Sequence, residues 1–218
     1  MASYIEALES AIQQYIGTPV LQRIKNNPST SQDTYQQITE ATILFIGVRS
    51  FTRKSKLLLT PEGMRALNQY FERMSSIICN NNGLIISLIG ESILAVYTDS
   101  NTNHADDACT TAIECLDALA VLNQKESNSL QLDIGIGVST GKVSLGNVGS
   151  KYKMNFTVMG DTVSLAFRLE TFTLPYKSNI VISENTSRLL SNKFIFRELD
   201  RISIKGFEGQ QTIFSVQS

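Results

Sequence analysis

The residue pair Gly90-Glu91 stands between two apolar runs, 84–89 and 92–97, and fixes one carboxylate between them. Glycine at the first central position is typical of a two-residue type II′ turn. The sequence therefore predicts a β-hairpin with Glu91 at its tip, where a carboxylate is well placed to ligate a metal ion. The hairpin by itself favours a solvated turn residue, because exposed acids at turns are common.

Other reactive side chains are sparse. The single histidine, His104, lies in a polar stretch, which argues against histidine-based catalysis and against a histidine-rich metal site. The three cysteines, Cys79, Cys109 and Cys115, have no CxxC spacing, so we interpret them as reduced residues and not as ligands or disulfides. Asp161 precedes a helical pattern and is interpreted as a helix cap.

The totals exclude several classes of protein. The chain has 218 residues, a formal net charge of −1 and 42% hydrophobic residues, which predicts a globular domain with one sizeable core. A near-zero charge without a basic run argues against a nucleic-acid partner. No apolar run approaches the roughly 20 residues needed to span a bilayer, and no signal-peptide pattern is present. We therefore expect a cytoplasmic domain without a membrane segment.

The elements that must position these residues follow from hydrophobic periodicity. Residues 1–38 predict a helical lead-in and linker, with an amphipathic helix over 4–16 and a short helical piece over 20–25. Residues 39–218 predict the main domain. Its first strand, 41–48, is apolar almost throughout, which indicates burial on both faces.

The later elements alternate in a recognisable order. Thr60 and Pro61 predict the start of a helix ending near Cys79. The further predicted elements are the hairpin, a helix capped by Asn103 or Asp106 and ending near 123, a strand over 130–138, a turn at 140–142, a short strand over 143–145, a flexible stretch over 146–150, a helix over 161–172, a strand over 180–182, a helix over 184–190, and strands near 194–196, 202–204 and 213–216. This order predicts an α+β fold with a ferredoxin-like βαββαβ core, a mostly antiparallel sheet with helices on one face.

Five ordered blocks of this chain resemble the motifs of one family. They are 44–52 (LFIGVRSFT), 83–97, 134–150, 156–170 (FTVMGDTVSLAFRLE), and the closing Ile204-Lys205-Gly206 with 214–216. On these blocks the chain resembles the class III nucleotide cyclases, the adenylyl and guanylyl cyclase catalytic domain, over about residues 41–216.

The resemblance implies a head-to-tail dimer with two sites, each built from both chains. It implies intramolecular phosphoryl transfer, in which the ribose 3′-oxygen of a nucleoside triphosphate attacks the α-phosphorus and pyrophosphate leaves. Two divalent metals, Mg²⁺ or Mn²⁺, serve this reaction in the family. The implied partners are a second copy of the chain or a competent cyclase.

Both metal positions of the family are altered in this sequence. The first metal carboxylate falls on Gly47, which has no side chain. The second falls on Glu91, whose extra methylene moves the oxygens by about 1.5 Å. Mg²⁺ tolerates such a displacement poorly, because it demands near-ideal octahedral geometry.

The remaining family positions are partly kept. The resemblance assigns the transition-state arginine to Arg168 and the phosphate-binding lysine to Lys205. It places base recognition at Ser87 and Thr157, where the family's lysine is replaced by serine, and ribose orientation at Ser164, which lacks the amide. Each has a simpler interpretation: a structural ion pair for Arg168, a solvated strand-end residue for Lys205, a strand-favouring residue for Thr157, and small polar replacements for the two serines.

Three functions are compatible with these residues. The favoured hypothesis is a degenerate cyclase domain, a pseudoenzyme that dimerises and regulates or scaffolds. The alternatives are an active cyclase with an altered metal site and base choice, and a nucleotide-binding sensor without turnover. A nucleic-acid reader on a ferredoxin-like sheet is disfavoured, since the paired aromatic residues that stack bases are missing and the net charge is not basic.

Overall fold

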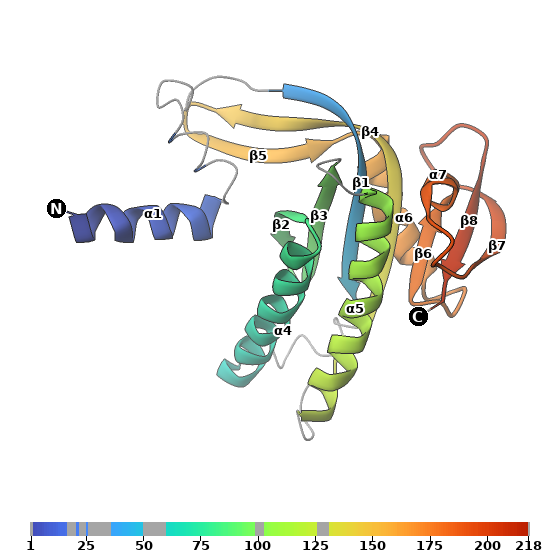
Figure 1. Cartoon of the computed structure of the whole chain (residues 1–218), viewed down its shortest axis with the longest axis horizontal. Helices are drawn as coiled ribbons and strands as arrows, with labels where there is room; N and C mark the ends of the chain where they lie inside the picture. The colour runs from blue at the N-terminus through green and yellow to red at the C-terminus, as the bar shows by residue number, and fades with distance from the viewer. Residues whose placement is uncertain are drawn as a thin grey trace.

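An eight-stranded sheet forms the centre of the molecule in the computed structural model, which describes residues 2–16, 21, 25, 36–49, 60–98, 103–125 and 131–217. Figure 1 shows this sheet with its helices. The strands are β1 (Gln36–Val48), β2 (Leu84–Ile89), β3 (Ser92–Thr98), β4 (Ile134–Ser150), β5 (Lys153–Met159), β6 (Ile180–Ser183), β7 (Phe196–Ser203) and β8 (Gln210–Val216). The helices are α1 (Ala2–Ile16), α4 (Pro61–Asn80), α5 (His104–Lys125), α6 (Asp161–Phe172) and α7 (Glu184–Leu189).

The sheet has the order β2-β3-β1-β4-β6-β8-β7, with β5 beside β4. All neighbouring strands are antiparallel except β4 and β6. The first four strands and two helices follow the predicted βαββαβ order. This arrangement confirms the α+β fold with a mostly antiparallel sheet.

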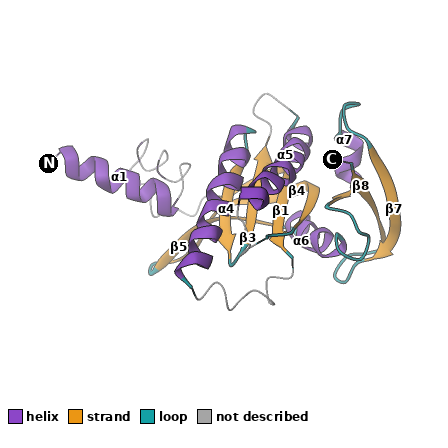
Figure 2. Ribbon diagram, turned by 90° about the horizontal axis from the view of Figure 1, so that it is seen from below, coloured by secondary structure: helices purple, strands orange, loops and turns teal. Residues whose placement is uncertain are grey.

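Helices cover both faces of the sheet. Leu44 and Ile46 of β1 pack into a cluster with α4 and α5, whereas Ile43 and Phe45 pack with α6. Figure 2 shows α4 and α5 together on one side of β1, with α6 on the other side. The expectation of helices on one face is therefore wrong. A strand that is apolar at successive positions requires cover on both sides.

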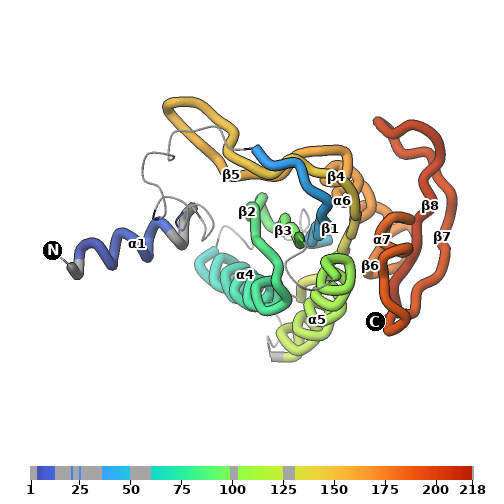
Figure 3. Tube along the Cα trace, turned by 45° about the horizontal axis from the view of Figure 1, so that its top comes forward, coloured from blue at the N-terminus to red at the C-terminus, as the bar shows by residue number. Residues whose placement is uncertain are grey.

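The central strands are longer than predicted. β1 begins at Gln36 instead of 41, and β4 continues through the predicted turn at 140–142 and the stretch expected to be flexible. Gly141 pairs with Ala41 inside the ladder. A Cβ on Gly141 would lie 2.8 Å from Oγ1 of Thr162, so glycine serves the close approach of α6 at this position and makes no turn. Figure 3 shows the resulting β4–β5 hairpin extending away from α4 and α5.

The structure shows which residues cap the N-termini of α4, α5 and α6. The Thr60 hydroxyl accepts a hydrogen bond from the Gly63 amide, which confirms the predicted start of α4. The Asn103 side chain accepts from the amides of Ala105 and Asp106, so Asn103 caps α5. Asp161 is not a cap: the N-cap position of α6 is Gly160, and Asp161 is the first helical residue.

Two further predictions concern the edge strand β7 and the N-terminal helix α1. The strands predicted near 194–196 and 202–204 are one strand, β7, whose polar sequence suits an exposed edge. The amphipathic helix at the start is confirmed as α1. The helical piece expected over 20–25 falls largely outside the described residues. No helix in the described ranges has the length and apolar character needed to cross a bilayer.

Candidate nucleotide site

The β2–β3 hairpin brings Glu91 beside the end of β1. Ile89 pairs with Ser92 across a two-residue turn, and Gly90 has a φ of +61°, as predicted for its first central position. β3 pairs with β1 up to Ile46 and Ile93. Beyond this pair come Gly47 on β1 and, on the other strand, Ser92 followed by Glu91 in the turn, so the two metal positions implied by the resemblance lie at the same end of the two strands.

The space that a side chain at position 47 would occupy is filled by Glu170 of α6. A Cβ on Gly47 would lie 2.7 Å from Oε1 and 2.8 Å from Cδ of Glu170. Gly135 pairs with Gly47 across β1 and β4; a Cβ on it would overlap Oγ1 of Thr173 and would lie 2.9 Å from the same Glu170 oxygen. The two glycines therefore form a cradle for one carboxylate. Partial burial raises the pKa of Glu170, and the nearby Arg49 guanidinium opposes that shift.

Arg49 fixes the end of α6 against the strand ends. Its Nη2 donates to the carbonyl oxygen of Ser178 at 2.7 Å, and its Nη1 donates to Oδ1 of Asn179 at 3.1 Å. Its Nε donates to Oγ1 of Thr173 at 3.3 Å. Because these bonds tie β1 to the segment that follows α6, the position of Glu170 is set by the tertiary structure.

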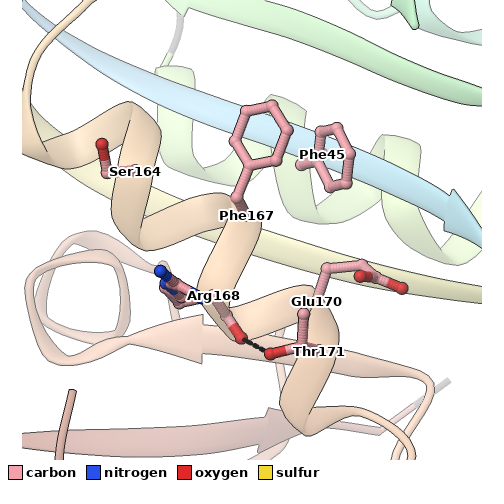
Figure 4. A pocket seen from close by; sticks show the side chains of 6 residues that line it. All are labelled: Phe45, Ser164, Phe167, Arg168, Glu170 and Thr171. Carbon is pink, nitrogen blue, oxygen red and sulfur yellow. Dashed lines mark hydrogen bonds between the residues drawn. The ribbon is translucent and has the colours of Figure 1, made fainter. Parts of the chain in front are cut away.

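An open cavity of about 380 Å³ lies along α6. Its lining residues are Phe45, Ser164, Phe167, Arg168, Glu170 and Thr171. The rings of Phe45 and Phe167 stack with centroids 3.9 Å apart. Figure 4 shows the two rings and Glu170 on one side of the α6 ribbon and Arg168 on the other side. A cation, a hydroxyl, an aromatic wall and a carboxylate therefore border one space.

The Arg168 side chain is available to bind a ligand. Its side chain is exposed one turn after Ser164, and among the described residues its guanidinium makes no ion pair or hydrogen bond. The simpler interpretation of Arg168 as a structural ion-pair residue therefore finds no support.

The other sequence-predicted residues lie elsewhere in the fold. Ser87 and Thr157 are half-buried on β2 and β5, two strands that touch. Lys205 is exposed at the turn between β7 and β8, at the opposite edge of the sheet from β2. Within one chain the structure thus joins Ser164 with Arg168, and leaves the other candidates outside that cavity.

In the described part of the chain, no three histidine, cysteine, aspartate or glutamate residues are grouped so that they hold a metal ion. Sequence reasoning gave Glu170 no role. The only sequence signal was the glycine at position 47, which leaves space for a neighbour but does not say which one.

Comparison with known protein families identifies the family of this domain. The model of the adenylate and guanylate cyclase catalytic domain matches residues 34–218. The chain belongs to this family. The resemblance seen in the sequence motifs is thereby confirmed for the whole sheet and for α6.

Curated relatives agree with this assignment. An adenylate cyclase of Anabaena cylindrica is 34% identical over 186 residues, covering 81% of this chain and 36% of the relative. The terminal-differentiation specific adenylate cyclase of Dictyostelium discoideum is 28% identical over 219 residues, covering 97% of this chain and 10% of the relative. This cyclase-family domain thus spans between a tenth and little more than a third of the length of these two relatives.

Solved structures share its architecture. The adenylyl cyclase CyaB from P. aeruginosa superimposes with a TM-score of 0.78 at 28% identity, over 84% of this chain and 96% of that one. A bacterial light-regulated adenylyl cyclase superimposes with a TM-score of 0.87 at 26% identity, over 99% of this chain and 62% of that one. The guanylyl cyclase Cya2 superimposes with a TM-score of 0.73 at 29% identity, over 83% of this chain and 92% of that one.

Proposed function

We propose that this cyclase-family domain binds a nucleoside triphosphate at a dimer interface and is catalytically impaired, so that it acts as a regulatory or scaffolding pseudo-cyclase. One observation carries the proposal. Arg168, to which the resemblance assigns the transition-state arginine, is exposed and unpaired within the described structure, whereas position 47 has no carboxylate of its own. A domain with this pattern keeps phosphate recognition and loses metal chemistry.

The dimer supplies what one chain lacks. Lys205 and Glu91 lie outside the cavity that contains Arg168. A head-to-tail homodimer, or a heterodimer with a competent cyclase, would bring such groups together from two chains. In a heterodimer this chain would contribute Arg168, Lys205 and Thr157 to a site whose metal carboxylates come from the partner.

The reaction in question places strict demands on charge. A bond forms between the ribose 3′-oxygen and the α-phosphorus, the bond from that phosphorus to the pyrophosphate oxygen breaks, and the 3′-hydroxyl proton is released. When bound, divalent cations activate the nucleophile and neutralise the leaving pyrophosphate. Losing about 4 kcal/mol of such stabilisation slows the reaction roughly a thousandfold. Arg168 and Lys205 would hold phosphate oxygens, and Ser164 would face the sugar.

Activity assays test this proposal directly. Purified full chain is incubated with ATP, GTP, CTP or UTP and with Mg²⁺ or Mn²⁺, and triphosphate binding is measured by calorimetry in parallel. Binding without appreciable cyclic nucleotide is the expected result. Turnover at rates typical of enzymes would overturn the impairment, and absence of binding at millimolar nucleotide would overturn the nucleotide site.

An active cyclase with an altered metal site is the second candidate, and the Glu170 carboxylate over Gly47 favours it. In that case Glu91→Ala abolishes activity, and Mn²⁺ supports turnover better than Mg²⁺. Activity that is unchanged in Glu91→Ala would reject this candidate.

A further inference from the structure

We propose that Asn82 is a latent deamidation site, which the folded domain holds unreactive through the end of α4 and through Asp107, and whose conversion loosens the connection from α4 to the β2–β3 hairpin. The site lies between the last residue of α4 and the first residue of β2. The inference goes beyond the proposed function, since it depends neither on nucleotide binding nor on turnover.

The dipeptide Asn82-Gly83 is the sequence in which this reaction meets the least steric hindrance, because a glycine offers no side chain beside the attacking nitrogen. The backbone nitrogen of Gly83 forms a bond to Cγ of Asn82, and the bond from Cγ to Nδ2 breaks. Ammonia leaves with the proton that the Gly83 nitrogen gives up, and a succinimide ring remains. Water then opens the ring to aspartate or to isoaspartate, in which the main chain runs through the former side chain. Asn82 is exposed, so water has access to it.

The fold itself requires this dipeptide at the end of α4. Asn82 has a φ of +63°, in the left-handed region that glycine and asparagine tolerate best. Its amide donates to the carbonyl oxygen of Cys79 at 3.3 Å, and the Gly83 amide donates to that of Ile78 at 2.8 Å, which are the two hydrogen bonds of a Schellman motif. A Cβ on Gly83 would lie 2.6 Å from Cζ of the buried Tyr97. The helix end thus needs a residue suited to this φ, followed by a glycine.

The same structure opposes the reaction. The nitrogen that would attack, that of Gly83, is held in its hydrogen bond to Ile78. The group that would leave, Nδ2 of Asn82, donates to Oδ2 of Asp107 at 3.1 Å, which ties the side-chain amide to the first turn of α5. Both hydrogen bonds must break before the succinimide can form. The folded domain therefore protects a dipeptide that its own backbone geometry demands.

Conversion would remove the contact that protected the site. An aspartate at position 82 has no side-chain N–H to donate, so two carboxylates would face each other where Asn82 now bonds Asp107. An isoaspartate would lengthen the main chain directly before β2, which begins at Leu84 and leads to the turn with Glu91. Either product weakens the connection that positions this hairpin against α4 and α5.

The test measures conversion at position 82 in the full chain. The protein is incubated at mildly alkaline pH, folded or in guanidinium chloride, and peptide mapping by mass spectrometry quantifies aspartate and isoaspartate. Asp107→Ala removes the acceptor, whereas Asp107→Asn keeps an acceptor oxygen. Asp117→Ala, which removes an exposed acid of the same helix, is the matched control.

We expect slow conversion in the folded wild type and in Asp117→Ala, and much faster conversion in guanidinium chloride. Asp107→Ala should convert roughly tenfold faster than the wild type, the factor typical of losing a hydrogen bond to a charged group. Asp107→Asn should convert nearly as slowly as the wild type. Equal rates in the folded and unfolded wild type, or equal rates in Asp107→Ala and Asp117→Ala, would overturn the proposal.

A second measurement tests the consequence of conversion and does not require Asp107→Ala to fold. Asn82→Asp reproduces one product, and urea unfolding gives its midpoint in the wild-type and Asp107→Asn backgrounds. The midpoint should fall in the wild-type background and fall less in Asp107→Asn, since that background removes one of the two facing charges. An unchanged midpoint, or an equal fall in both backgrounds, would overturn the proposed loosening.

Discussion

Gly137 of β4 lies directly under the backbone of Ala166 in α6, so close that a Cβ on this glycine would overlap the Ala166 carbonyl oxygen. The backbone nitrogen of Glu170 would be only 2.5 Å from the same Cβ. The helix that carries Ser164, Arg168 and Glu170 therefore rests on β4 without an intervening side chain. Its position relative to β1 depends on this contact.

Gly137→Ala should destabilise the domain by about 1–3 kcal/mol or more, because backbone atoms must move to admit the methyl group. Urea unfolding measures the change. Gly90→Ala is the control: nothing lies within 4 Å of its Cβ, so only the strain of its φ of +61° remains, about 1–2 kcal/mol. Equal stability of wild type and Gly137→Ala would contradict the packing described here.

Arg168→Ala should weaken triphosphate binding by about 10- to 100-fold, since a charge-assisted hydrogen bond contributes about 1.5–3 kcal/mol. Its thermal stability should stay within about 0.5 kcal/mol of the wild type, because its guanidinium has no partner within the described structure. Arg197→Ala, an exposed arginine on β7, is the matched control. Equal loss of affinity in both variants would indicate a general charge effect.

Thr42→Val should cost about 1–3 kcal/mol of unfolding free energy, because it leaves buried polar groups without their partner. The Thr42 hydroxyl is 2.7 Å from Nδ1 of His104 and 2.8 Å from Oγ1 of Thr140, all three residues being buried. Chemical denaturation measures the loss. Thr39→Val makes the same change near the exposed start of β1 and should have little effect on the unfolding free energy. A similar loss of unfolding free energy in the two variants would refute a specific role for the buried hydrogen bonds of Thr42 with His104 and Thr140.

Cys79 should be the cysteine that thiol reagents modify in the folded protein, with Cys109 and Cys115 reacting only after unfolding. Cys79 is exposed, whereas the other two are buried in the core, where desolvation raises the pKa of Cys115 to about 12. Desolvation also raises the pKa of Cys79, so its modification should be slower than that of free cysteine at pH 8 and should accelerate with rising pH. Mass spectrometry after alkylation identifies the sites, and rapid native labelling of Cys109 would contradict the model of the core.

Local sequence signals predicted many of the elements. Gly90-Glu91 predicted the hairpin, Thr60-Pro61 predicted the start of α4, and the ordered motifs predicted the family and the antiparallel sheet. These succeeded because turn residues, caps and hydrophobic periods act over a few neighbouring positions. Gly141 misled the prediction because a glycine in sequence looks the same whether it bends the chain or admits a helix against a strand.

Residue types alone establish which chemical groups are present: a carboxylate at Glu91, cations at Arg168 and Lys205, and no side chain at Gly47. What fills the space at position 47 follows from the fold. Glu170 is distant from Gly47 along the chain, and their meeting depends on α6 packing across β1 and β4 and on Gly135 lying opposite Gly47. Local patterns specify elements, whereas contacts between distant residues follow from how those elements pack.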